Sequence, residues 1–311
     1  MRSLRAVDPS LTDSDLGKAW LATLEHQRRL SRHTLANYSR ATRALFELKE
    51  KTALRDLEAA QIRRFVARLH AAGLSGRSLA LTLSAWRGFY HWLARHKSFP
   101  ANPVQGVRAP KSPRHLPKVL SVEQAQQLLE GAAPQAGNPA PSDLRDRAMF
   151  ELLYSSGLRL AELVALDADD GRLDLKQAEV TVTGKGGKTR TVPVGGRARE
   201  ALRDWLKARA LLAAPQERAL FVGARGKRIA PGTVQARLRA WARRQGLGGS
   251  VHPHMLRHSF ASHVLQSSQD LRAVQEMLGH ASISTTQVYT HLDFQALAKV
   301  YDAAHPRARK K

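Results

Sequence analysis

The chain has no cysteine among its 311 residues. This absence excludes disulfides, thiolate metal ligands and cysteine nucleophiles together. Long apolar runs are also missing, and none approaches the length of a bilayer-spanning helix, which argues against a membrane protein. The first residues, MRSLRAVDPSLTDSD, contain no apolar signal core, so we expect a cytoplasmic protein.

Acidic residues are scarce relative to basic ones. The 26 Asp and Glu stand against 50 Lys and Arg, which leaves a formal net charge of +24. A surplus of this size favours a polyanionic partner, and nucleic acid fits better than a membrane surface because the basic residues are spread along the whole chain. The clustered acids that a two-metal nuclease needs are hard to find. One dense run, at residues 167–174, is typical of a solvated loop.

Residues 10–98 are predicted to form a four-helix unit. Apolar side chains recur at helical spacing within 31–51 and 78–95, which indicates amphipathic helices. A third helix is predicted over 59–72, and a shorter first helix precedes these three. Arginines are frequent between the apolar positions, but a single arginine on a helix face is usually only solvated, so we assign no DNA contact to any of them.

A change in composition follows at residues 99–117, which contain five prolines. Proline fixes φ and removes a backbone donor, so we predict an extended basic linker there. A second domain, expected over 118–299, mixes helices with one β-hairpin, because β-branched runs flank the sequence GKGGK. A basic tail is predicted over 300–311. Two domains joined by a basic hinge can close around a duplex as a C-shaped clamp.

Residues 157–163 (GLRLAEL) place an arginine at the start of a predicted helix. Gly157 lets the chain turn, and the free N–H groups of the helix start help the guanidinium of Arg159 to grip a phosphate. Glu162 lies one turn further on and is placed to hold that guanidinium. Taken alone, the pattern favours an ordinary surface Arg–Glu pair.

Residues 183–190 (TGKGGKTR) predict the tip of the hairpin. Glycines let such a tip approach a ligand closely, and we expect Lys185, Lys188 and Arg190 to project toward a phosphate or a DNA groove. The glycine spacing is not that of a Walker loop. The alternative is a polar turn whose lysines protect a sheet edge.

Residues 252–263 (HPHMLRHSFASH) predict a helix with Pro253 at its first position. His254 and Arg257 are three residues apart and are expected to share a face. The spacing of His254 and His258 raises zinc as an alternative. That alternative is weaker because the glutamate of the HExxH motif is absent and the arginine would oppose a dication.

Residues 278–291 (LGHASISTTQVYTH) contain His280 and Tyr289. Alone, Tyr289 predicts only a half-buried helix residue, since a phenol of pKa about 10 is a poor nucleophile unless it is activated. Together the four patterns suit a phosphodiester. Two arginines neutralise charge on the non-bridging oxygens without a metal, a lysine protonates the leaving oxygen, and a histidine takes the phenol proton.

The ordered set of residues resembles the tyrosine recombinase (phage-integrase-like) family, and the resemblance covers nearly the whole chain. The family's pattern is an arginine in a GLRxxEL helix, a lysine on a β-hairpin, HxLR, LGH, and a tyrosine nine residues after that histidine. The matching positions here are Arg159, Lys185, His254, Arg257, His280 and Tyr289.

The resemblance implies a mostly α fold with a small β-sheet in the catalytic domain, preceded by a four-helix, SAM-like core-binding domain. It implies that Tyr289 attacks the scissile phosphate and forms a 3′-phosphotyrosyl link. Lys185 would be the general acid, and His254 would assist proton transfer from the tyrosine. The phosphorane would be stabilised by the remaining members of the set, Arg159, Arg257 and His280. Because bond energy is kept in the covalent link, no cofactor, metal or ATP is implied.

Within that family, residues 251–308 and the linker sequence APKSPRHLPK are similar to recombinases that resolve chromosome dimers and plasmid multimers at dif-like sites during cell division. That similarity implies double-stranded DNA as the substrate. It also implies a heterotetramer with two copies of a second recombinase, XerD, and activation by the septal translocase FtsK. Three alternatives stay open: a phage or mobile-element integrase, a type IB topoisomerase, and an architectural DNA-binding protein without catalysis.

Overall fold

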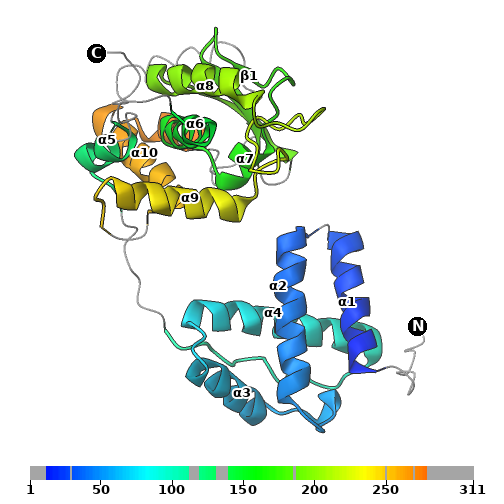
Figure 1. Cartoon of the computed structure of the whole chain (residues 1–311). Coiled ribbons are helices and arrows are strands. Elements are labelled where there is room, and N and C mark those ends of the chain that lie inside the picture. The colour runs from blue at the N-terminus through cyan, green and yellow to red at the C-terminus, as the bar shows by residue number, and fades with distance from the viewer. Residues whose placement is uncertain are drawn as a thin grey trace. The chain divides into compact units, whose positions relative to one another are not determined.

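The computed structural model describes residues 12–28, 30–111, 119–130, 139–184, 187–248, 251–268 and 270–278. The chain divides into two compact units, Met1–His115 and Leu116–Lys311 (Figure 1). Each unit has its own hydrophobic core. No helix within these described ranges is long and apolar enough to cross a bilayer. The basic tail predicted over 300–311 lies outside the described residues.

The first unit is the predicted four-helix domain. Its helices are α1 (Asp13–Arg28), α2 (Arg32–Leu48), α3 (Ala59–Ala71) and α4 (Gly76–Lys97), with a short 3-10 turn, η1 (Leu54–Asp56), before α3. Serines begin two of them: the hydroxyls of Ser31 and Ser75 accept hydrogen bonds from backbone N–H groups one turn into α2 and α4. This part of the expected fold is therefore confirmed.

Aromatic side chains fill the core of this unit. Trp86 and Tyr90 of α4 are fully buried, and each finds a partner for its polar atom. The Trp86 indole N–H donates to the Ala41 carbonyl at 2.6 Å, and the Tyr90 hydroxyl donates to the Leu54 carbonyl at 2.9 Å. Paired in this way, the rings contribute apolar burial without leaving a donor unsatisfied.

Part of the predicted linker belongs to this core. Phe99, Val104 and Val107 are buried against the four helices. Asn102 holds the turn between them, since its side-chain N–H donates to the Arg87 carbonyl at 3.1 Å. The described residues of the predicted linker form no helix, as expected, but their burial was not part of the prediction. Prolines exclude a helix but do not stop apolar residues between them from being buried. Residues 112–118 lie outside the described part of the chain.

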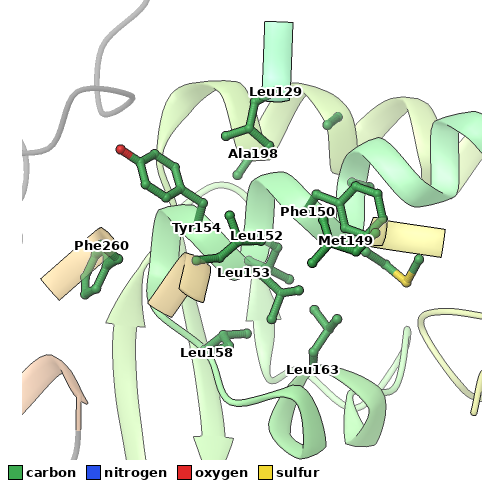
Figure 2. Close-up of a cluster of buried hydrophobic side chains, with 14 of the residues drawn as sticks. Leu129, Met149, Phe150, Leu152, Leu153, Tyr154, Leu158, Leu163, Ala198 and Phe260 are labelled. Carbon is green, nitrogen blue, oxygen red and sulfur yellow. The ribbon is translucent and has the colours of Figure 1, made fainter. Parts of the chain in front are cut away.

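The second unit is built around helix α6 (Pro141–Ser156), which is buried over most of its length. Figure 2 shows side chains of α6, from Met149 to Tyr154, packed among Leu158, Leu163, Ala198 and Phe260. A helix that is buried on all sides is expected at the centre of a large core. The elements around it are α5 (Val122–Glu130), α7 (Leu160–Ala165), α8 (Gly196–Arg209), α9 (Pro231–Arg244), α10 (Pro253–Ser268) and α11 (Leu271–Leu278).

A three-stranded antiparallel sheet completes the unit. Its strands are β1 (Leu173–Asp174), β2 (Glu179–Thr183) and β3 (Thr189–Pro193), in the order β1-β2-β3. The β2–β3 pair is the predicted hairpin, and Val180 lies opposite Val192 in its register. The mostly helical fold with a small sheet is thus confirmed.

Candidate active site

Gly157 places the first arginine of the predicted site. Helix α6 ends at Ser156, and Gly157 follows with a left-handed backbone, φ 57°. A Cβ at this position would lie 2.4 Å from Cδ1 of the Phe260 ring, so only glycine fits without a shift of the ring. The turn buries Leu158 in the core and places Arg159 at the N-cap position, immediately before the first residue of α7.

The predicted Arg159–Glu162 pair is present. Arg159 Nη1 donates to Glu162 Oε1 at 2.8 Å, and Glu162 Oε2 accepts the backbone N–H of Arg159 at 2.7 Å. The Glu162 side chain is 3% exposed, whereas 34% of the Arg159 side chain remains exposed. The carboxylate therefore fixes the guanidinium of Arg159 although part of the side chain is exposed.

Arg190 does not project from the hairpin as we predicted. It is buried, and its Nη1 and Nη2 donate to the two oxygens of Glu162 at 2.6 and 2.8 Å. Its Nε donates to the carbonyl of Met277 in α11 at 2.9 Å. The reason is strand alternation: Arg190 shares a face of β3 with Val192, and that face is turned into the core.

Helix α10 begins at Pro253, as predicted, and carries Arg257 into the interior. Arg257 donates to the carbonyl of Gly157 through Nη1 at 2.5 Å and to the carbonyl of Leu278 through Nη2. His254, one turn earlier, is exposed. His254 and Arg257 both lie on α10. Among the described residues, hydrogen bonds anchor the side chain of Arg257 but not that of His254.

The electrostatics of the cluster follow from its three guanidinium groups and one carboxylate. Burial alone would raise the pKa of Glu162, but hydrogen bonds from Arg190 and Arg159 outweigh it and lower the pKa to about 2. Burial, followed by repulsion from Arg159 and Arg190, lowers the pKa of Arg257 to about 10. Glu162 and Arg257 are therefore both charged near neutral pH. With three guanidinium groups and one carboxylate, the cluster is net positive.

Histidines surround the start of α10. The Nδ1 atom of His252 accepts the backbone N–H of Met255 at 3.2 Å and so caps the helix. Burial, together with repulsion from His254, lowers the pKa of both His252 and His258. Within the described ranges, no three His, Asp or Glu side chains are grouped as metal ligands.

A buried polar chain that the sequence did not predict links α6, α10 and the start of the second unit. Tyr154 shares a hydrogen bond of 2.8 Å with Nδ1 of His263, and Nε2 of His263 lies 3.0 Å from the Leu120 carbonyl. A carbonyl only accepts, so Nε2 carries the proton and Nδ1 accepts the Tyr154 hydroxyl. The Tyr154 hydroxyl is thus engaged within the core.

Three members of the predicted set, Lys185, His280 and Tyr289, lie outside the described residues. The last described residues before these positions, Gly184 and Leu278, nevertheless have informative neighbours. A Cβ on Gly184, the residue before Lys185, would lie 3.5 Å from Glu162 Oε1 and 3.7 Å from Arg159 Nη1. Leu278, two residues before His280, accepts the hydrogen bond from Arg257.

The described part of the site thus contains two predicted phosphate-binding arginines, Arg159 and Arg257, which interact electrostatically and are fixed by different elements. Preorganised cations of this kind stabilise a phosphoryl group at which negative charge develops. Hydrogen bonds to the Glu162 carboxylate and to the carbonyls of Gly157 and Leu278 fix the two side chains within the protein.

Comparison with known proteins gives two family matches. Residues 118–296 match the phage integrase family, and residues 18–97 match the phage integrase N-terminal SAM-like domain. Among curated proteins, the chain is similar to "Tyrosine recombinase XerC 1" of Ralstonia nicotianae, with 55% identity over 94% of each chain. It is 53% identical to "Tyrosine recombinase XerC" of Pseudomonas aeruginosa, over 94% of this chain and 95% of that one.

Solved structures give the same fold at lower identity. A XerH site-specific recombinase bound to a palindromic difH substrate, in a post-cleavage complex, aligns with a TM-score of 0.69 and 23% identity, covering 94% of this chain and 84% of that one. A lambda integrase tetramer bound to a Holliday junction aligns with a TM-score of 0.68 and 19% identity, covering 91% and 82%.

Proposed function

The chain belongs to the phage integrase family and is a site-specific tyrosine recombinase of DNA, and from that premise we propose that Tyr289 is its nucleophile. The observation that supports this most is the charged cluster of Arg159, Glu162 and Arg257. Gly184, the residue before Lys185, adjoins this cluster, and Leu278, which precedes His280 and Tyr289 in the sequence, is bonded to Arg257. A cationic site for one phosphate is the part of the machinery that a phosphotyrosyl transfer needs most.

The proposed cleavage is a transesterification. The phenol oxygen of Tyr289 forms a bond to phosphorus and the bond to the 5′ oxygen breaks, so the 3′ phosphate stays on the protein. His254 receives the phenol proton, and Lys185 supplies a proton to the leaving 5′ oxygen. Charge on the non-bridging oxygens is stabilised by the other three members of the set, Arg159, Arg257 and His280. Rejoining reverses these steps with a 5′-hydroxyl from a partner duplex.

We further propose that the chain acts as the XerC-type member of a pair. Curated relatives that are named XerC align with this chain over almost their full length. The proposed assembly contains two copies of this chain and two of XerD on two dif-like duplexes, with FtsK as activator and chromosome-dimer resolution as the outcome. Because chromosomal DNA is the substrate, the proposed compartment is the cytoplasm.

A nicked suicide duplex tests the nucleophile. Cleavage next to the nick releases a short fragment, so the covalent protein–DNA adduct accumulates and is seen as a band of lower mobility on a denaturing gel. Wild type should give the adduct and Tyr289→Phe should give none. Tyr154→Phe and Tyr301→Phe are the matched controls and should keep forming it. An adduct from Tyr289→Phe at the wild-type level would overturn the assignment.

The partner is tested separately. Band shifts on a dif-like duplex with and without XerD should show cooperative binding, and recombination should require both proteins. Efficient recombination without XerD would instead support a mobile-element integrase. Relaxation of supercoiled plasmid that lacks any dif-like site would support a topoisomerase.

A further inference from the structure

Arg190 is the one member of the guanidinium cluster that the proposed chemistry does not use. We propose that it is a positioning residue for cleavage: it keeps Glu162 ionised beneath Arg159 and fixes the last turn of α11, from which the chain continues to His280 and Tyr289. This inference rests on the proposed function of the same site.

The first step concerns the charge of Glu162. Arg190 engages both carboxylate oxygens, at 2.6 and 2.8 Å, and Oε1 is shared with Nη1 of Arg159. Burial acts to raise the pKa of Glu162, and the hydrogen bonds from the two arginines hold it at about 2. Without Arg190, burial is opposed mainly by Arg159, so the pKa rises. A neutral Glu162 is a weaker acceptor and holds Arg159 less firmly.

The second step concerns α11. The last carbonyls of a helix have no partner within the helix, and they favour a cation. Here two neighbouring carbonyls are taken by two different arginines, Met277 by Arg190 and Leu278 by Arg257. Arg190 therefore ties the end of α11 to the same carboxylate that holds Arg159.

Arg190 is unsuited to binding the phosphate itself. Its Nε, Nη1 and Nη2 all donate to protein acceptors, and its side chain is 8% exposed. Arg159, by comparison, keeps a third of its side chain exposed. The two arginines that bind Glu162 therefore differ: Arg159 is partly exposed, whereas Arg190 is buried and bound on every nitrogen to the protein.

The same unit contains a matched control. Arg145 is also buried, donates twice to a buried carboxylate, Asp146 Oδ1, at 2.9 and 2.7 Å, and donates once to a carbonyl, that of Val222, at 3.0 Å. None of these partners belongs to the predicted set or adjoins it. Arg145→Met therefore removes the same kind of bonds as Arg190→Met but leaves the cluster intact.

The test uses full-length protein, XerD and the nicked suicide duplex at saturating concentration, below the melting temperature of each variant. Both methionine variants should melt at lower temperature than wild type and still bind the duplex. Only Arg190→Met should lose single-turnover cleavage, by ~100-fold, because a small misplacement of reacting groups is enough for a loss of that size.

The pH profile supplies a readout that a purely structural role would not move. Wild-type Glu162, with its pKa near 2, stays ionised from mildly acidic to alkaline pH. In Arg190→Met the raised pKa means that its charge is lost as the pH falls through that new value. The acidic limb of the cleavage profile should therefore move to higher pH in Arg190→Met and stay in place in Arg145→Met.

Arg190→Lys keeps the test decisive if Arg190→Met does not fold. Lysine retains a charge beside Glu162 but cannot make all three hydrogen bonds, so the acidic limb should stay near that of wild type while cleavage remains slow. Equal cleavage losses in the Arg190 and Arg145 variants, or wild-type cleavage by folded Arg190→Lys, would overturn the proposal. So would rescue of Arg190→Met by a duplex with a neutral methylphosphonate at the cleavage position, since that would show direct contact with the phosphate charge. If wild type itself forms no adduct, the proposed function fails instead.

Discussion

Gly157 has a left-handed backbone and lies close to the Phe260 ring, and each of these two features disfavours any other residue there. The position matters because the turn at Gly157 orients Arg159. Gly171 offers a comparison, because it has φ +72° but a Cβ on it would meet nothing within 4 Å. The two glycines therefore separate the effect of backbone strain from the effect of the ring.

We expect Gly157→Ala to destabilise the protein more than Gly171→Ala. Both substitutions force alanine into the left-handed region, which costs roughly 1–2 kcal/mol. Only the first also drives a methyl group into Phe260. Urea unfolding of the two variants measures the difference, and Gly157→Ala should also slow cleavage because Arg159 shifts. Equal destabilisation would show that the ring yields without cost.

Of the two predicted phosphate-binding arginines, Arg159 has the more exposed side chain, because Arg257 is buried. Arg159→Ala should lower single-turnover cleavage by ~10²–10³-fold, the loss typical of one preorganised donor, while DNA binding changes little. Arg218 is the control, since it is an exposed arginine paired with Asp169 at 3.4 Å. Arg218→Ala should cleave at the wild-type rate. Wild-type cleavage by Arg159→Ala would remove it from the site.

At the scale of elements, α10 does two things at once. Its first turns carry His254 and Arg257, and its middle holds both backbone groups of Leu120. Ser259 Oγ accepts the Leu120 N–H at 2.9 Å, and His263 donates to the Leu120 carbonyl at 3.0 Å. The beginning of the second unit is therefore fixed directly to the helix that carries the predicted arginine.

This anchor should weaken in acid. Burial, which outweighs the opposing influence of the Leu120 carbonyl and Glu123, lowers the pKa of His263 below its usual value. A depressed pKa means that the neutral form is favoured in the folded state, so its contribution is complete above about pH 6.5 and is lost as the pH falls through the folded pKa. We expect the free energy of unfolding of wild type to fall between neutral and mildly acidic pH.

Substitution of the histidine tests the source of that fall. His263→Gln should be less stable than wild type at neutral pH, and its stability should depend less on pH over the same interval. Urea titrations at both pH values give the comparison. An unchanged pH dependence in His263→Gln would assign the effect to His252 and His258, whose pKa values are also lowered.

At the scale of the whole molecule, the net charge of +24 should make the affinity for DNA depend strongly on salt concentration. Arg108 and Lys111 are exposed and stand just before the residues that join the two units. If they follow the phosphate backbone, Arg108→Ala/Lys111→Ala should reduce the slope of log affinity against log salt by about 0.9 for each lost contact. The charge-preserving Arg108→Lys/Lys111→Arg should keep the slope. An unchanged slope in the alanine variant would argue against a linker that tracks DNA.

Much of this molecule was predictable from periodicity and spacing. The helices of the first unit, the hairpin and the Arg159–Glu162 pair all depend on interactions between residues close in sequence, so hydrophobic periodicity and residue spacing predict them. The burial of Phe99 was not predictable from its proline-rich surroundings, because burial depends on contacts with distant helices. The same holds for the contact between Tyr154 and His263, which are 109 residues apart.

Arg190 is an intermediate case, because its inward direction could have been found. Strand β3 alternates, and Val192 on the same face is an obvious core residue. We predicted an outward side chain because the sequence TGKGGKTR is basic, and we did not apply the alternation of β3 to Arg190. A charge in a strand that shares its face with buried valines is better interpreted as half of a buried ion pair.

The hydrogen bonds of α10 span long stretches of sequence, and this has a consequence for the order in which the nascent chain matures. Arg257 reaches back 100 residues to Gly157, and His263 reaches back 143 residues to Leu120. Domains fold as units during synthesis, from the N-terminus onward. On the ribosome, the basic four-helix unit can therefore fold and meet DNA well before α10 emerges, while the arginine cluster stays open until nearly the whole chain has been made. A recombinase that cuts DNA would thus be unable to do so while it is still being translated.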